Sequence, residues 1–256
     1  MTGVQTCALP IFVSSIQYFR YNRFVKISGV KDWVSDWRSY LAEFLGTFLF
    51  VLISSFAVLT EALYGDIGVL EIGLVIGFSY TCLIFTFAHL GGGYLNPAIT
   101  ISLWLVQRLS ASRTVFFLTA QLIASFMAAW VLLLFFGADG IKYALGSPSL
   151  GLNISLTQAV LAEAVFTAGL VLVLFSTIVD RRGPISFGPL ALGLYLVATS
   201  IILISVTGAA LNPARVIGPA IVSKSTNTLA VWIIGPLAGS LIGIVYELVF
   251  LRKLRK

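Results

Sequence analysis

The sequence predicts an all-α membrane protein with six transmembrane helices and two re-entrant half-helices, arranged as an inverted repeat. Three observations lead to this fold class. The chain of 256 residues is 59% hydrophobic and only 10% charged, whereas soluble domains carry about 25% charged residues. Apolar runs long enough to cross a bilayer occur six times. The tripeptide Asn-Pro-Ala occurs twice, at 96–98 and 212–214, each time after an apolar run.

Each of the six apolar runs comes close to the roughly 20 residues that a transmembrane helix needs. They lie at 39–60, 70–90, 113–136, 156–178, 187–207 and 229–251. Two shorter segments, 97–107 and 213–222, follow the Asn-Pro-Ala copies. Ten helical residues rise about 15 Å, which is half the thickness of the hydrocarbon core. Each short segment is therefore expected to reach only the middle of the bilayer.

Basic residues gather on one side of these spans. Six spans place both ends of the chain on the same side, and only Lys142 and Lys224 fall in loops on the other side. The basic residues on the side of the termini are Arg20, Arg23, Lys26, Lys31, Arg38, Arg108, Arg113, Arg181, Arg182, Arg252, Lys253, Arg255 and Lys256. Since cytoplasmic loops are enriched in Lys and Arg, both termini are expected in the cytoplasm, with the protein in the cell membrane. The net charge of +6 is thus assigned to orientation and not to nucleic-acid binding.

The chain divides into one channel domain and its flanking segments. The expected segments are an N-terminal stretch at 1–11, a cytoplasmic segment at 12–38, a channel domain at 39–251 with repeats at about 39–136 and 156–251, and a basic cytoplasmic tail at 252–256. The first stretch, MTGVQTCALPI, resembles a translated sequencing adapter. It is expected to be an assembly artefact, the alternative being a genuine amphipathic tail.

The two halves of the chain contain similar sequence segments. "LAEFLGTF" opens the first span and "LAEAVFTAG" opens the fourth, which aligns Glu43 with Glu163. Because three spans separate the copies, the second half must insert upside down, and the two half-helices can meet at the midplane. Non-helical backbone at that depth needs hydrogen-bond partners. Both glutamates are therefore expected to accept bonds from loop N–H groups, with a proton-relay role as the alternative.

The paired motifs place two polar side chains at the predicted midplane. The motif residues are Asn96, Pro97, Ala98, Asn212, Pro213 and Ala214. Asn is a favoured N-cap and Pro is favoured at the first helical position, so each asparagine oxygen would cap a half-helix and leave both hydrogens of its NH₂ group free. Two such donors would orient a water molecule so that a proton-conducting chain breaks there. The positive ends of both helix dipoles would repel cations. The alternative is that each Asn-Pro only caps a helix.

Arg215 lies three residues into the second half-helix. A guanidinium at this depth is costly unless it faces water or a partner. It is interpreted as a pore-lining donor and a positive barrier, the alternative being an arginine that reaches out to the interface.

The motifs "HLGGGYLNPA", "GAALNPARVIGPA", the two "AE" openings and "GPLAG" at 235–239 resemble the aquaporin (major intrinsic protein) family, from about Tyr40 onward. The resemblance implies a homotetramer with one pore per subunit and no cofactor. It also implies a second, outer filter at Ile76, Ser200, Ala209 and Arg215.

These filter residues match neither typical pattern of the family. Water-strict members carry an aromatic residue at the first position and histidine at the second, where this chain has Ile76 and Ser200. Glycerol-conducting members carry aromatics at the first and third positions, and the third is Ala209 here. Water is the expected main substrate, with small neutral solutes such as glycerol or ammonia as further candidates. His89 is expected to support the loop before the first motif, a pH gate being the alternative, and Cys82 is expected to be a packed thiol.

Other functions agree less well with the sequence. A dedicated solute facilitator stays within the same class. An inverted-repeat secondary transporter would need ionisable groups at the midplane, and only the two glutamates are present there. An intramembrane enzyme would need a nucleophile with a base, or a metal cluster, but the chain has one histidine, and its two cysteines, Cys7 and Cys82, suggest neither a disulfide framework nor a metal site.

Overall fold

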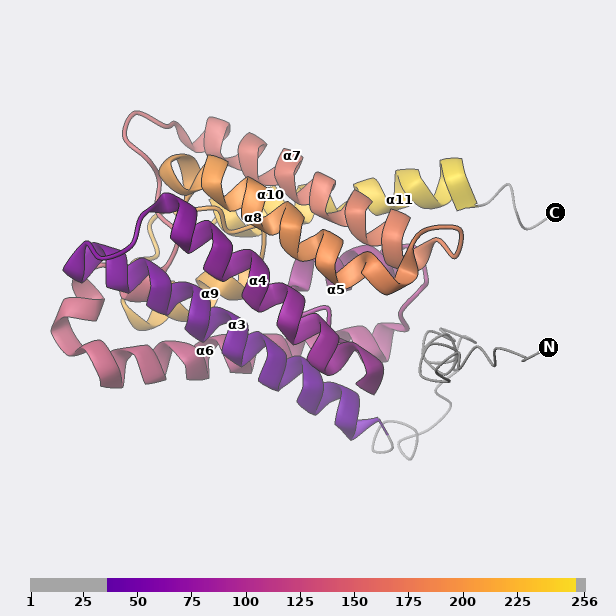
Figure 1. The fold of residues 1–256 in the computed structure, drawn as a ribbon, viewed down its shortest axis with the longest axis horizontal. Helices are drawn as coiled ribbons and strands as arrows, with labels where there is room; N and C mark the ends of the chain where they lie inside the picture. The colour runs from indigo at the N-terminus through magenta and orange to yellow at the C-terminus, as the bar shows by residue number, and fades with distance from the viewer. Residues whose placement is uncertain (1–35, 252–256) are drawn as a thin grey trace, which may run out of the picture.

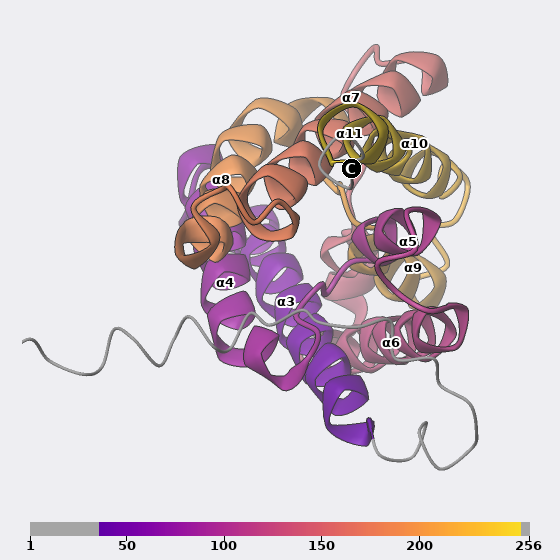
Figure 2. The same ribbon diagram turned by 90° about the vertical axis from the view of Figure 1, so that its right-hand side faces the viewer.

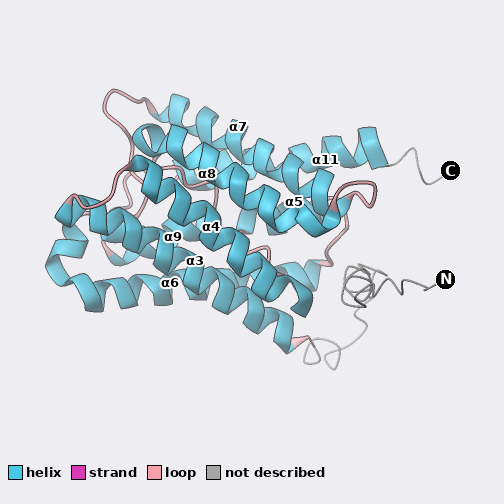
Figure 3. Ribbon diagram, in the orientation of Figure 1, coloured by secondary structure: helices cyan, strands magenta, loops and turns pink. Residues whose placement is uncertain are grey.

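The computed structural model describes residues 36–251. The adapter-like stretch, almost all of the predicted N-terminal segment, and the basic tail lie outside the described residues. The elements, in chain order, are α3 (Trp37–Tyr64), α4 (Val69–Phe87), η2 (Ala88–Leu90), α5 (Pro97–Leu105), α6 (Ala111–Lys142), η3 (Ala144–Gly146), α7 (Leu156–Leu174), η4 (Phe175–Val179), η5 (Ile185–Phe187), α8 (Gly188–Thr207), α9 (Pro213–Val222), α10 (Val231–Ser240), α11 (Ile242–Tyr246) and η6 (Glu247–Leu251). Within this range every regular element is helical (Figure 3).

The six predicted spans are confirmed. Within residues 36–251, six helical segments are long and apolar enough to cross a membrane. The first is longer than predicted, at Trp37–Tyr64; the third, Ala111–Lys142, has a break in helical geometry at Gly137, one residue after the predicted end at 136. Hydropathy marks only the part of a helix inside the bilayer, and the helix continues until a cap ends it. For α3 that cap is Gly65, whose positive φ of 67° suits glycine and whose N–H donates to the carbonyl of Glu61.

The long helices lie side by side, roughly along the long axis of the view (Figure 1). Helix α3 begins and η6 ends on the right of this view, which we call the terminal face; the opposite side is the far face. Figure 2 looks onto the terminal face and shows the half-helices α5 and α9 close together, between α6 and α10. Helices α3 and α7 run in opposite directions, as an inverted repeat requires.

Helix packing follows the repeat. Helix α3 packs on α6 in the first half, as α7 packs on α10 in the second, and α4 packs on α8 across the two halves. The half-helices cross over, since α9 packs on α6 and α5 packs on α10. Helix α5 also packs on α6 of its own repeat, so each short helix contacts the opposite repeat without relying on it alone, and the two Asn-Pro-Ala motifs come together.

Glycines permit the closest of these crossings. A Cβ added to Gly77 of α4 would collide with the backbone carbonyl of Gly193 in α8. A Cβ added to Gly239 of α10 would collide with the carbonyl of Ala164 in α7. Small residues at such positions let helix backbones approach closely inside a membrane.

The expectation that Cys82 is packed is wrong. Its side chain is exposed on the surface of α4. Helix α4 is apolar on all sides, so its sequence contains no polar stripe that would mark which face is buried.

Candidate functional site

The two asparagines cap the two half-helices as predicted. Asn96 is the N-cap of α5, and its oxygen accepts a hydrogen bond from the N–H of Ala98 at 2.9 Å. Asn212 is the N-cap of α9, and its oxygen accepts from the N–H of Ala214 at 3.0 Å. A proline occupies the start of each helix, where a missing N–H removes no helical bond.

The asparagine amides also join the two repeats directly. The Nδ2 of Asn96 donates to the carbonyl of Leu211 at 2.8 Å, and the Nδ2 of Asn212 donates to the carbonyl of Leu95 at 2.8 Å. The expectation that both hydrogens of each NH₂ are free is therefore wrong, because one is used in this crossed pair. The reason is tertiary: the residue before each motif presents its carbonyl to the asparagine of the other repeat.

Each loop before a motif is held by a buried glutamate. The carboxylate of Glu43 accepts from the N–H groups of Tyr94 at 2.7 Å and Leu95 at 2.9 Å, and from the Nε2 of Gln121 at 2.7 Å. A Cβ added to Gly92 would collide with this carboxylate, at 2.6 Å from one of its oxygens. A glycine at this position thus lets the loop backbone approach the glutamate.

The second glutamate repeats the arrangement with a different third partner. Glu163 accepts from the N–H groups of Ala210 at 3.1 Å and Leu211 at 2.8 Å, and from the hydroxyl of Thr207 at 2.6 Å. Glu43 and Glu163 are both fully buried. The predicted hydrogen bonds from the loop N–H groups are present in both repeats.

Arg215 is fully buried near the start of α9. Its Nη1 donates to the carbonyl of Gly208 at 2.8 Å and to that of Ala209. Within residues 36–251, its Nε and Nη2 are buried without a hydrogen-bond partner. A guanidinium buried in this way is costly unless water or a ligand satisfies the remaining donors.

The other three predicted filter residues are also buried. Ala209 contacts Arg215 through its carbonyl, while Ile76 and Ser200 lie in α4 and α8, which pack against each other. The hydroxyl of Ser200 has no hydrogen-bond partner within the described residues. His89 lies exposed in η2, just before the first loop.

Sequence reasoning missed several residues that hold the half-helices. Gln121 also donates to the hydroxyl of Thr100 at 2.9 Å. The hydroxyl of Ser125 in α6 accepts from the N–H of Gly218 at 2.9 Å and donates to the carbonyl of Ala214, so it bridges one turn of α9. Polar side chains inside an apolar span are the signal that could have found them, because such groups are buried only when they have partners.

A separate polar cluster lies at the terminal face, where Asp180 and Arg182, in the segment between two spans, meet the end of the sixth span. Asp180 accepts from the Nε of Arg182 at 2.9 and 3.2 Å, from its Nη2 at 2.6 Å, and from the Tyr246 hydroxyl at 3.2 Å. The Arg182 guanidinium lowers the pKa of Asp180 to about 2. Nearby, Arg108 pairs with Glu247 at 2.9 Å, which ties the segment after α5 to the last helix.

Metal-ligating residues do not gather in the described part of the chain. Within residues 36–251, no group of three or more His, Cys, Asp or Glu side chains is placed to hold a metal ion.

Three comparisons place the chain among known proteins. Residues 30–246 match the model of the family described as "Major intrinsic protein". The chain is 33% identical to "Aquaporin Z" from Photorhabdus laumondii, over 84% of this chain and 99% of the relative. It is 35% identical to "Lens fiber major intrinsic protein" from Gallus gallus, over 84% of this chain and 82% of the relative.

Relatives with other names match over a similar range. "Glycerol uptake facilitator protein-like 6" from Lactiplantibacillus plantarum is 32% identical, over 80% of this chain and 94% of the relative. The fold resembles the solved structure of the aquaglyceroporin from Plasmodium falciparum, with a TM-score of 0.75, 24% identity, and coverage of 86% of this chain and 98% of that one. From the family match, together with the six spans and the paired motifs, we conclude that this multi-pass membrane protein belongs to the major intrinsic protein family of channels, which are not enzymes.

Proposed function

We propose that this channel conducts water passively, together with small neutral solutes, and excludes protons and other ions. The observation that carries the proposal is the crossed hydrogen bonding of the two asparagines between α5 and α9. This geometry fixes the direction in which both amides can bond.

Each asparagine keeps a donor for a passage, while its oxygen is turned toward its own helix. The oxygens of Asn96 and Asn212 are occupied by N–H groups of their own helices, and one hydrogen of each NH₂ bonds a carbonyl of the other repeat. One N–H therefore remains on each amide. A water molecule between them must accept with its oxygen and point its hydrogens away. Such a water cannot relay a proton from one neighbour to the next.

Positive charge adds a second barrier. The N-termini of α5 and α9 meet at the asparagines, and helix N-termini carry about half a positive charge. Arg215 keeps three N–H hydrogens on its unpartnered Nε and Nη2, and the unpartnered hydroxyl of Ser200 is a further polar group. Donors buried in this state support a water-filled filter, since passing water satisfies them while the positive charge repels cations.

A second candidate, a facilitator of glycerol and similar neutral solutes, is favoured by the filter side chains. Ile76, Ser200 and Ala209 are shorter than the aromatic and histidine side chains that narrow a strict water filter. One relative is itself named a glycerol uptake facilitator-like protein. The filter would be wider as a result, and both water and glycerol fluxes have to be measured.

Orientation and assembly extend the proposal. Arg108, Arg113 and Arg182 lie at the terminal face, and an excess of basic residues supports a cytoplasmic position for that face. The family resemblance supports a homotetramer with one pore in each subunit. Protease protection in sealed vesicles tests the orientation, and native mass spectrometry tests the subunit number.

Stopped-flow light scattering on proteoliposomes tests the function. A water pore gives fast shrinkage with a low activation energy and no proton current. Glycerol gradients in the same vesicles decide between the two candidates. Saturable uptake coupled to an ion gradient would contradict a passive channel.

Two variants with a matched control locate the barrier. Asn96→Asp keeps a capping oxygen but replaces the NH₂ that faces the carbonyl of Leu211, so proton or cation leakage should rise. Arg215→Val should raise leakage of cations or of larger solutes. Arg182→Val removes an arginine that lies outside the spans and should leave permeability unchanged. If Arg215→Val matches this control, Arg215 is not part of the filter.

A further inference from the structure

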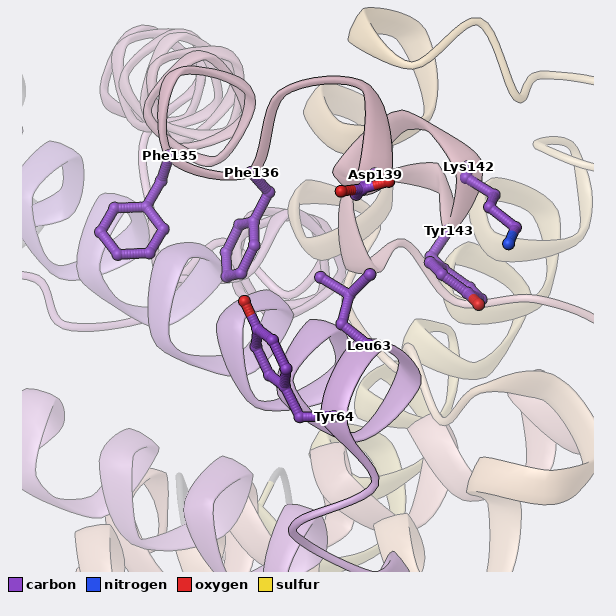
Figure 4. Close-up of a pocket in the computed structure, with 7 residues that line it drawn as sticks. All are labelled: Leu63, Tyr64, Phe135, Phe136, Asp139, Lys142 and Tyr143. Atoms are coloured by element: carbon purple, nitrogen blue, oxygen red, sulfur yellow. The ribbon is translucent and has the colours of Figure 1, made fainter.

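A pocket at the far face has no place in the proposed conduction mechanism. It lies between the end of α3 and the end of α6 and has a volume of ≈ 450 Å³. This falls within the range of roughly 300–1,000 Å³ that is typical of small-molecule sites. Figure 4 shows Tyr64 and Phe136 on one side of it, Lys142 and Tyr143 on the other, and Asp139 above.

A break in α6 creates the pocket. At Gly137 the backbone leaves helical geometry, with φ of 55° and ψ of −135°. Figure 4 shows the chain arching away after Phe136 and returning at Asp139. This conformation is available to glycine and is strained for other residues. The bend turns the last part of α6 over the end of α3.

The pocket contains two opposite charges that do not neutralise each other. Asp139 and Lys142 are three residues apart near the end of α6, a spacing at which helical side chains can meet. Within residues 36–251, however, neither forms an ion pair. The Lys142 ammonium instead lies 5.2 Å from the ring centroid of Tyr143. A carboxylate and an ammonium are therefore both available to a ligand of complementary charges.

The surroundings of the pocket are those of a bilayer surface. Leu134 and Phe135, just before the bend, are 84% and 69% exposed on a membrane-spanning helix, so they face lipid tails. The charges follow within the next two turns, and Tyr64 and Tyr143 are residues typical of the membrane–water interface. A ligand here would have a charged head beside the pocket and an apolar tail along α6.

We propose that this pocket binds the headgroup of a phospholipid that carries a primary ammonium and a phosphate, the class represented by phosphatidylethanolamine. Asp139 accepts the ammonium, and Lys142 binds the phosphate. A primary ammonium is favoured over a quaternary one because it can donate hydrogen bonds to the carboxylate, and charge-assisted bonds are the stronger kind. The face of Tyr143, which could otherwise attract a quaternary cation, is already occupied by Lys142.

Native mass spectrometry of the full chain released from nanodiscs tests the proposal. The nanodiscs contain equal amounts of phosphatidylethanolamine, phosphatidylcholine and phosphatidylglycerol with identical acyl chains. The wild-type protein should retain phosphatidylethanolamine about fivefold over each of the others, as expected for one partly exposed charge pair. Equal retention of the three lipids, or a preference for either of the others, would overturn the proposal.

The two charges give different signatures. Asp139→Asn should bring retention of phosphatidylethanolamine down to that of phosphatidylglycerol, because only the ammonium contact is lost. Lys142→Gln should lower all three lipids together, because all three carry the phosphate. The controls Asp66→Asn and Lys224→Gln make the same charge changes outside the pocket and should change nothing. Equal effects of the control variants would show bulk electrostatics and refute the site.

Further measurements distinguish a lipid in this pocket from a soluble ligand or a protein partner. Free phosphoethanolamine, which has the headgroup but no tail, should fail to displace the lipid at equal concentration; displacement would identify a soluble ligand instead. Gly137→Ala meets no atom within 4 Å but is strained by the backbone conformation, so it should reduce lipid preference through the bend alone. If Asp139→Asn and Lys142→Gln changed the subunit number and not lipid retention, the pocket would be a protein interface.

Discussion

The two buried glutamates allow a sharp prediction, because the same substitution should have different costs at the two sites. Glu43 and Glu163 each hold two loop N–H groups, but their third partners differ. Gln121 contacts Glu43 as a donor, whereas Thr207 contacts Glu163 through a hydroxyl that can donate or accept. Replacing each glutamate by glutamine removes one acceptor oxygen and adds an NH₂ group.

At the first site one amide NH₂ stays unsatisfied whichever way the side chain of Gln121 is turned. If the unpartnered Oε1 of Gln121 accepts from the new NH₂, the NH₂ of Gln121 takes the position that has no partner within the described residues. In Glu43→Gln the best placement keeps the single oxygen on Leu95 and Gln121, so the NH₂ faces the N–H of Tyr94, 2.7 Å from the atom it replaces. One backbone donor and one amide NH₂ are left buried without partners. At about 1–3 kcal/mol for each, the cost is about 2–6 kcal/mol of the free energy of unfolding.

At the second site the hydroxyl can reverse its role. In Glu163→Gln the oxygen can stay on the N–H of Leu211 while the NH₂ donates to the Thr207 hydroxyl, whose own hydrogen turns to a backbone carbonyl one turn earlier in α8. The N–H of Ala210 is then left unsatisfied. The cost is then about 1–3 kcal/mol, so the two variants should differ by about 1–3 kcal/mol.

The order of stability is measured by unfolding the detergent-solubilised protein with a denaturing detergent and monitoring tryptophan fluorescence. The wild type should be most stable, then Glu163→Gln, then Glu43→Gln. Glu71→Gln, at an exposed carboxylate, is the matched control and should stay within about 0.5 kcal/mol of the wild type. In the Glu163→Gln background, Thr207→Val should add a further loss. A Glu163→Gln variant as unstable as Glu43→Gln would refute the reasoning about the third partner.

Three other predictions concern single positions. The pKa of Asp180 falls from 3.8 to about 2 on folding. Its pairing with Arg182 therefore stabilises the protein above about pH 4, and this stabilisation is lost as the pH falls toward 2. In Asp180→Asn the thermal midpoint should depend less on pH over this range. In Gly218→Ala the new Cβ would collide with the backbone of Ser125. The free energy of unfolding should fall by about 1–3 kcal/mol in the same assay, and water permeability should fall as well. Mercurials should inhibit weakly, because the third filter position is Ala209 and no proposed filter residue carries a thiol; a strong block that disappears in Cys82→Ser would contradict this.

The architecture is predictable from the residues alone. Apolar runs of bilayer length fixed the six spans because lipid offers no hydrogen-bond partners and leaves little choice but helix. The two Asn-Pro pairs fixed where the half-helices begin, since Asn caps and Pro starts a helix through local geometry alone. Glu43 and Glu163 were identifiable as loop supports because a carboxylate in an apolar span needs donors.

Which atoms meet depends on how the helices pack. The carbonyls of Leu95 and Leu211 carry no side-chain signal, yet they take one hydrogen from each asparagine across the repeats. The choice of Gln121 for Glu43 and Thr207 for Glu163 depends on helices that pack from different parts of the chain. Local sequence governs caps and hydropathy because those act within one or two turns, whereas these contacts join residues more than 40 positions apart, through the packing of helices that are apolar on nearly every face.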